Sequence, residues 1–201
     1  MGGPPSTMLQ EDKIQLLARV ARAYSGPAAT GDPETPISIL SLAAASYGAR
    51  PADEATVPTG FDPLAVALFE AIVEGAYLVA AADGVVDVDE RRAFERVVTT
   101  ACGGAVPPKS IAALVADLAD QLAEDGMDRR IQVVASQVHK REHAREVLRI
   151  AALLAHSSDN VSDIERTILA KLATACGLEA NEVDLAIADV KRVLSETGTP
   201  T

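Results

Sequence analysis

Two short acidic segments of this chain repeat one pattern, and that repeat constrains the fold more than any other feature. Residues 83–91 read DGVVDVDER and residues 158–166 read SDNVSDIER. Each segment follows an alanine-rich stretch with apolar residues at helical spacing and precedes another such stretch. The repeating unit is therefore predicted to be a helix, an acidic turn and a second helix, used twice along the chain.

The composition favours close packing of helices. The chain has 201 residues, of which 48% are hydrophobic but only 3% are aromatic, with no tryptophan. Alanine and leucine are strong helix formers, whereas strands are enriched in aromatic and β-branched residues. A chain of this length can also bury a sizeable core. We therefore predict an all-α fold, a compact bundle of about seven helices with an internal duplication.

Charge and cysteine content narrow the range of partners. The formal net charge is −11, which opposes binding to phosphate backbones and makes nucleic acid a poor partner. A cation or a basic face of a protein fits better. Two cysteines are too few for a disulfide framework, so the cysteine content favours a location in the cytoplasm. With no signal peptide and no stretch near ~20 apolar residues, we expect no membrane span, although the protein could sit at the inner membrane against a membrane-protein complex.

Proline and glycine divide the chain into three parts. Residues 1–60 hold most of the prolines and are predicted to form an extension with one or two short helices. Residues 61–195 are predicted to form the helical domain, and residues 196–201 a flexible tail. Apolar residues recur at helical spacing in residues 9–24 and 37–47, and we expect at least one of these pieces to pack on the core.

Local signals place several helix ends. Asp62 followed by Pro63 predicts a helix start. Asp87 with Glu90, and Ser162 with Glu165, have the spacing of a capping box. Asp128 is predicted to cap the helix that carries Ile131, Val134 and Val138.

The first acidic segment, set between two helices rich in alanine and leucine, resembles the signature of the TerB-like family. That family includes the tellurite-resistance protein TerB and the amino-terminal domain of a membrane-anchored DnaJ-type cochaperone. The resemblance covers about residues 61–195 and implies a seven-helix bundle with an internal pseudo-two-fold. It also implies a role in tellurite resistance, stress response and membrane-linked metal-sensing complexes.

The second segment fits the first in two ways. An overlay without gaps places Ser158, Val161, Ser162 and Glu165 on Asp83, Val86, Asp87 and Glu90. A shift by one residue instead pairs Asp159 and Asn160 with Asp83 and Gly84, since asparagine tolerates the left-handed conformation that glycine supplies. This second pairing requires a one-residue deletion.

The carboxylates of both segments are candidate ligands for a hard cation such as calcium or magnesium. The spacing differs from the EF-hand loop. The alternative is that these residues only begin helices, with Gly84 as a helix breaker. The candidate ligands are Asp83, Asp87, Asp89 and Glu90 in the first segment, and Asp159, Asp163 and Glu165 in the second.

Two further patterns are weaker. His139, Glu142 and His143 match the H-x-x-E-H pattern of inverted zinc peptidases, but a solvated helix face explains them better because positive side chains lie beside the histidines. A basic cluster could meet an acidic partner or an anionic lipid surface, or it could balance the acidic residues internally. Its members are Arg129, Arg130, Lys140, Arg141, Arg145 and Arg149.

These observations predict a protein that is not an enzyme, since no nucleophile elbow and no phosphate-binding glycine loop is present. The expected role is that of an interaction or regulatory module that responds to a divalent cation, in a complex for stress response or tellurite resistance. The alternative is a scaffold or cargo-type assembly protein that is recruited through residues 1–60.

Overall fold

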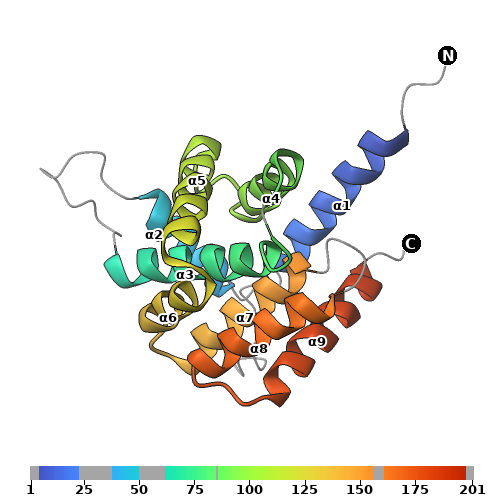
Figure 1. Cartoon of the computed structure of the whole chain (residues 1–201). Helices are drawn as coiled ribbons and strands as arrows, with labels where there is room; N and C mark the ends of the chain where they lie inside the picture. The colour runs from blue at the N-terminus through green and yellow to red at the C-terminus, as the bar shows by residue number, and fades with distance from the viewer. Residues whose placement is uncertain (1–4, 23–37, 50–61, 85, 156–160, 198–201) are drawn as a thin grey trace, which may run out of the picture.

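Every regular element is an α-helix in the residues that the computed structural model describes, which are 5–22, 38–49, 62–84, 86–155 and 161–197 (Figure 1). The all-α prediction is confirmed over these ranges, while the internal duplication stays a prediction. The helices are α1 (Pro5–Arg22), α2 (Ile39–Gly48), α3 (Pro63–Ala80), α4 (Val88–Ala101), α5 (Pro108–Asp125), α6 (Met127–Gln137), α7 (Arg141–Ala155), α8 (Asp163–Ala175) and α9 (Asn181–Thr197).

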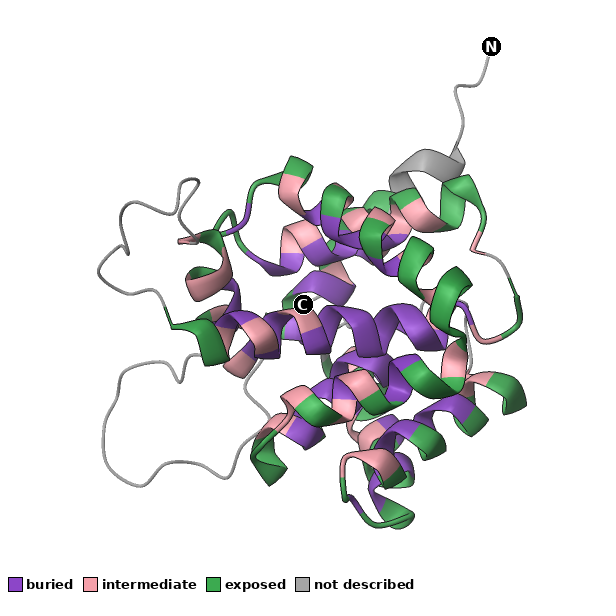
Figure 2. Cartoon of the chain, turned by 60° about the vertical axis from the view of Figure 1, so that its left-hand side comes forward, coloured by how far each residue is buried: buried purple, intermediate pink, exposed green. Residues whose placement is uncertain are grey.

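Helix α3 is the central element of the fold. It packs against α2, α5, α6, α7 and α8, and its residues Phe69 and Ile72 are completely buried. Figure 2 shows the buried residues running along this helix through the middle of the molecule. By length and composition alone, α3 is also apolar enough to cross a membrane, but 67% of it is buried inside the fold, so the expectation of no membrane span stays a prediction. The core helix of a soluble protein has the same character.

The predicted helix starts are largely confirmed. The Asp62 side chain accepts a hydrogen bond from the backbone N–H of Leu64, and Pro63 is the first residue of α3. The predicted cap at Asp128 is wrong. Helix α6 begins after Gly126, and Asp128 lies in its first turn, where it accepts a bond from Lys171 at 2.7 Å.

Helices α1 and α2 share the hydrophobic core with the rest of the chain. Ile14, Leu17 and Ala18 of α1, and Leu40 and Ala44 of α2, belong to the same buried cluster as α3 and α7. The nine helices of the described ranges therefore exceed the expected bundle of about seven by these two. The expected packing of the early helices on the core is confirmed. The expected domain boundary at residue 60 lies outside the described residues.

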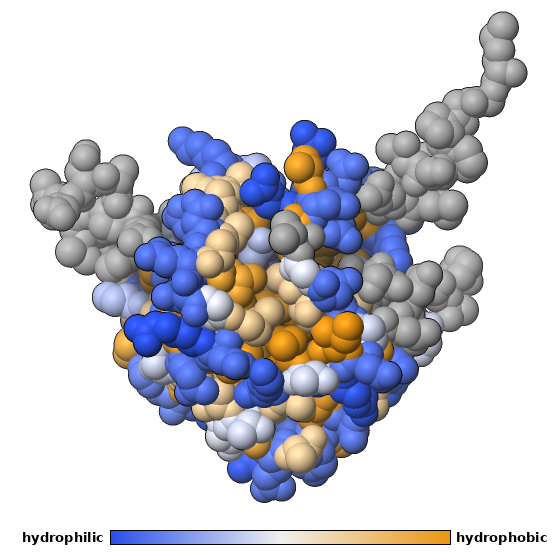
Figure 3. Space-filling view, in the orientation of Figure 1, coloured by the Kyte–Doolittle hydropathy of each residue, from blue (hydrophilic) through white to orange (hydrophobic). Residues whose placement is uncertain are grey.

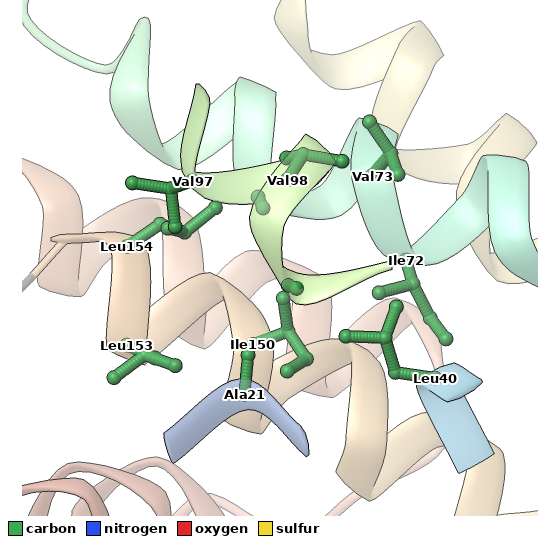
Figure 4. A pocket seen from close by; sticks show the side chains of 11 residues that line it. Ala21, Leu40, Ile72, Val73, Val97, Val98, Ile150, Leu153 and Leu154 are labelled. Carbon is green, nitrogen blue, oxygen red and sulfur yellow. The ribbon is translucent and has the colours of Figure 1, made fainter. Parts of the chain in front are cut away.

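A cavity of about 20 Å³ lies where α1, α2, α3, α4 and α7 meet (Figure 4). Its volume is close to that of one water molecule, and its lining is apolar, so a water inside would find no hydrogen-bond partner. The cavity is therefore a packing defect and too small for an organic ligand. It is lined by Ala21, Leu40, Ile72, Val73, Ala76, Val97, Val98, Ala101, Ile150, Leu153 and Leu154.

Gly48, the last residue of α2, allows a close approach between backbones. A Cβ atom at this position would lie 1.8 Å from the carbonyl oxygen of Ala105, in the loop between α4 and α5. We expect Gly48→Ala to lower the free energy of unfolding by about 1–3 kcal/mol, because backbone must shift to make room. Urea denaturation measures the change, with Leu42→Ala on the exposed face of α2 as the control. Equal stability of the two variants would contradict the prediction.

Candidate functional site

The first acidic turn connects the end of α3 to the start of α4. Asp83 and Gly84 are exposed, and Gly84 has φ of 145°, a conformation that residues with a Cβ rarely adopt. No atom lies within 4 Å of the position of a Cβ on Gly84, so its backbone conformation, and not lack of space, favours glycine here. Helix α3 itself ends at Ala80, so Gly84 belongs to the turn that follows the helix and does not break it, and Asp83 lies exposed in the same turn.

Asp87 and Glu90 form the predicted capping box at the start of α4. Asp87 Oδ1 accepts hydrogen bonds from the backbone N–H groups of Asp89 at 2.8 Å and Glu90 at 2.9 Å. Glu90 Oε2 accepts a bond from the backbone N–H of Asp87 at 2.9 Å. The cap therefore uses one oxygen of each carboxylate, and the second oxygen of each is not part of it.

The second acidic turn has the same cap with different chemistry. The hydroxyl of Ser162 accepts a hydrogen bond from the backbone N–H of Glu165 at 3.2 Å, and Glu165 Oε2 accepts one from the backbone N–H of Ser162 at 2.7 Å. This predicted capping box is also confirmed. Asp163 is the exposed first residue of α8. The candidate ligand Asp159 lies outside the described residues.

The described candidate carboxylates are not arranged around a common position that a metal ion could occupy. Among the described residues, no group of three or more histidine, cysteine, aspartate or glutamate side chains is placed to hold a metal ion. Asp83, Asp87, Asp89 and Glu90 are all exposed, and Asp89 lies 3.4 Å from the guanidinium of Arg92. The capping role is therefore the one that the geometry displays, and metal binding stays a prediction.

The basic cluster is largely matched by acidic groups within the fold. Arg141 and Arg145 both donate to Glu182 at the start of α9, with shortest distances of 2.9 and 2.7 Å. Arg149 donates to Glu146 at 2.8 and 3.0 Å. The pair of Glu146 with Arg149 lies within α7, whereas Arg141 and Arg145 join α7 to α9. Internal balance therefore explains most of this cluster better than an acidic partner does.

Arg130, also from the basic cluster, forms a buried ion pair that sequence inspection missed. Its Nε donates to Glu74 in the middle of α3 at 2.6 Å, and its Nη1 donates to Asp125 at 3.1 Å. Glu74 is only 3% exposed, and burial raises the pKa of its carboxyl even though the guanidinium opposes this. The available signal was a glutamate on the apolar stripe of a helix, because such a residue needs a buried partner.

The two histidines do not form the zinc pattern. Helix α7 begins at Arg141, so His139 precedes the helix that carries His143. The pattern of inverted zinc peptidases needs both imidazoles one turn apart on the same helix. Burial, followed by the charge of Lys140, lowers the pKa of the half-buried His143. His139 and His143 therefore do not form a zinc site of this type.

Apolar side chains gather in a hollow on the face seen in Figure 3. The hollow lies over the C-terminal half of α3, whose residues 72–79 are themselves buried, between α5 and α8, and hydrophilic side chains surround it (Figures 1 and 3). Helix α3 packs against both of these helices. The first acidic turn follows the same end of α3, so its exposed carboxylates and the apolar hollow lie close together on the surface.

Glu182 gives the fold a specific pH dependence. Hydrogen bonds from Arg145 and then Arg141 lower its pKa from 4.5 to about 2. A carboxyl with a lowered pKa in the folded state stabilises the fold above its unfolded pKa, and this contribution is lost as the pH falls from about 4.5 to about 2. The arginines are half-exposed, so solvent screening reduces the effect. We expect Glu182→Gln to lose less stability than the wild type between pH 5 and pH 3, measured by urea denaturation.

Glu179→Gln is the matched control for this prediction. Glu179 lies near the same arginine, at 3.7 Å from Arg141, but its side chain is 73% exposed. It should keep the wild-type loss of stability in acid. A pH dependence in Glu182→Gln that equals that of the wild type would contradict the assignment.

A family model described as tellurite resistance protein TerB matches residues 69–188. The matched range runs from within α3 to within α9 and includes both acidic turns. No curated protein and no solved structure matches the chain.

Proposed function

The chain belongs to the TerB family, and from this premise we propose that it is a non-enzymatic interaction module in a complex for tellurite resistance or stress response. In this proposal the module is cytoplasmic and meets the inner membrane only through a membrane-protein partner. A divalent cation, calcium or magnesium, binds at the first acidic turn and changes how well the partner binds.

The observation that carries the proposal is the position of the first acidic turn. The turn joins α3 to α4, and it places four exposed carboxylates within eight residues beside the apolar hollow of Figure 3. The oxygens of Asp87 and Glu90 that the cap does not use, together with Asp83 and Asp89, are hard ligands of the kind that calcium and magnesium prefer. Cation binding there requires the exposed carboxylates to move toward one another.

The apolar hollow supports a protein partner. Exposed apolar surface rimmed by polar residues is typical of interaction sites. A cation that draws the carboxylates of the turn together would fix the position of α4 relative to α3. Because α3 borders the hollow, this would alter the shape of the hollow. The binding of cation and partner would then be linked, and each would strengthen the other by the same factor.

Calorimetric titration of the metal-stripped protein tests cation binding. We expect saturable heat with calcium or magnesium in the wild type and none in Asp83→Asn. Asp83 is the best position for the test because it lies outside the hydrogen bonds of the capping box, so the substitution removes a ligand and keeps the cap. Zinc, which prefers nitrogen and sulfur ligands, should bind no better than at other exposed carboxylates.

Asp117→Asn is the matched control, since Asp117 is an exposed aspartate of α5 and belongs to neither acidic segment. It should bind the cation as the wild type does. Equal heat in all three proteins would assign binding to the general negative charge and not to the turn. The absence of heat in the wild type would leave the acidic turns as helix caps and end the cation part of the proposal.

The alternative role, recruitment through residues 1–60, has no observation of its own in its favour. The described parts of that segment, α1 and α2, contribute to the hydrophobic core. They are thus part of the packed fold, and the proposal above does not assign them a role in binding.

A further inference from the structure

Helix α1 lies outside the residues that match the family, and yet it covers a face of the matched domain. The match begins at residue 69, whereas α1 ends at Arg22. Its described residues pack against α4, α7 and α9, and Figure 1 shows it at one edge of the molecule. The family domain therefore has an apolar face, formed by α4, α7 and α9, which an additional helix fills.

The contact has the form of an amphipathic helix in a groove. Ile14, Leu17, Ala18 and Ala21 follow the spacing i, i+3, i+4 and i+7, and each is at most 3% exposed. The opposite face of α1 is polar and exposed, with Glu11, Asp12, Gln15, Arg19 and Arg22. This pattern is the one by which helical segments are recognised in hydrophobic grooves of other proteins.

The groove also recognises the end of the helix. Arg149 of α7 donates to the backbone carbonyls of Val20 at 3.0 Å and Ala21 at 2.8 Å. Carbonyls in the last turn of a helix have no partner within the helix, and a cation is favourable there. Glu146 bonds to Arg149 and keeps the guanidinium in place. Any helix of suitable length that ends at this point offers the same carbonyls.

An ion pair at the side of α1 is solvent-exposed, and a cavity lies beside one end of the helix. The ion pair of Arg96 with Glu11 is about half-exposed on both sides, so it contributes little to stability. Ala21 lines the cavity of about 20 Å³ together with residues of α2, α3, α4 and α7. Over its described residues, α1 is thus anchored chiefly by its apolar stripe and by the bonds from Arg149.

We propose that α4, α7 and α9 form a helix-binding groove, and that α1 is its resident but displaceable occupant. The partner is an amphipathic helix of another protein, with small and branched apolar residues at the spacing of α1 and a free C-terminal turn for Arg149. Because α1 belongs to the same chain as the groove, a free helix competes with an intramolecular one, whose effective concentration is of the order of millimolar for a short linker. A partner helix therefore enters only when it binds better than α1 or when α1 is released.

A synthetic peptide with the sequence of residues 5–22 is the probe, titrated into the full chain without metal. The tethered α1 of the wild type should exclude it. Leu17→Asp places a charge in the groove and should release α1, so the full chain with this substitution should bind the peptide at least tenfold more tightly than the wild type. Gln15→Asp adds the same charge on the exposed face of α1 and should behave as the wild type does.

Hydrogen exchange supplies a readout that does not depend on any variant. In the wild type, the amides of α1 should exchange at least tenfold faster than those of α3, because α1 opens alone while α3 opens only with the whole fold. Equal protection of α1 and α3 would make α1 an integral part of the core and overturn the proposal. Folded Leu17→Asp that fails to bind the peptide would overturn it as well.

Discussion

Arg130→Met should lower the free energy of unfolding by about 3–5 kcal/mol, because it leaves the carboxylate of Glu74 buried without its partner. The methionine retains the apolar part of the side chain, so most of the loss comes from the uncompensated charge. Glu74 is 3% exposed and lies in α3, the helix around which the fold is built. Urea denaturation of the wild type and the variant measures the difference.

The pH dependence of the stability of Arg130→Met shows whether the buried charge of Glu74 causes the loss. Without Arg130, only burial acts strongly on Glu74 and its pKa rises further. A group whose pKa is raised in the folded state stabilises the fold below its unfolded pKa, and this stability is lost as the pH rises through the folded pKa. Lowering the pH from 7 to 5 should therefore restore part of the stability of Arg130→Met. A loss that is independent of pH would point to packing instead.

A double variant distinguishes the loss of the whole ion pair from the cost of leaving one buried charge without its partner. When both partners of a buried pair become apolar residues of similar volume, the result is often neutral or stabilising. Glu74→Leu combined with Arg130→Met should thus recover most of the stability that Arg130→Met loses. Arg129→Met is the control, because Arg129 is 74% exposed and lies 3.6 Å from the same Asp125. It should change the free energy of unfolding by less than about 1 kcal/mol.

Arg149→Met should cost a similar amount, about 3–5 kcal/mol, through two separate losses. Glu146 is left as a buried carboxylate without its guanidinium, and the carbonyls of Val20 and Ala21 lose their donor. An unsatisfied buried polar group costs about 1–3 kcal/mol by itself. Denaturation in urea gives the total, and hydrogen exchange shows which elements lose protection.

Removing Glu146 as well should separate the cost of its buried charge from the cost of the unpaired carbonyls of α1. In Glu146→Leu combined with Arg149→Met the buried charge is gone, so the global stability should largely return. The carbonyls of α1 remain without a donor in this protein, so the amides of α1 should still exchange faster than in the wild type. Full recovery of protection in α1 would show that Arg149 matters only as the partner of Glu146.

The parts of the structure that sequence inspection predicted depend on neighbours in sequence. The capping boxes at Asp87 and Ser162 and the start of α3 at Asp62 each involve residues within three positions, so the pattern of residue types determines them. The all-α class follows in the same way from composition and apolar spacing. These elements could be predicted because each satisfies its own backbone groups locally.

The buried ion pairs could not be predicted because their partners are distant in sequence. Arg130 meets Glu74 of α3, and Arg149 meets the end of α1, far earlier in the chain. Asp128 was expected to cap α6, but its pairing with Lys171 depends on how α6 and α8 pack. The candidate cation site is undecided for a related reason, since its carboxylates are exposed and no packing fixes their positions.

The contact of α1 with α9 has a consequence for how the protein is made. Residues 5–22 leave the ribosome long before residues 181–197, and protein synthesis adds about 5–20 residues per second. The apolar stripe of α1 therefore waits on the order of ten seconds before one wall of its binding groove exists. During that interval the stripe is exposed on the nascent chain, where other apolar segments or a chaperone can bind it.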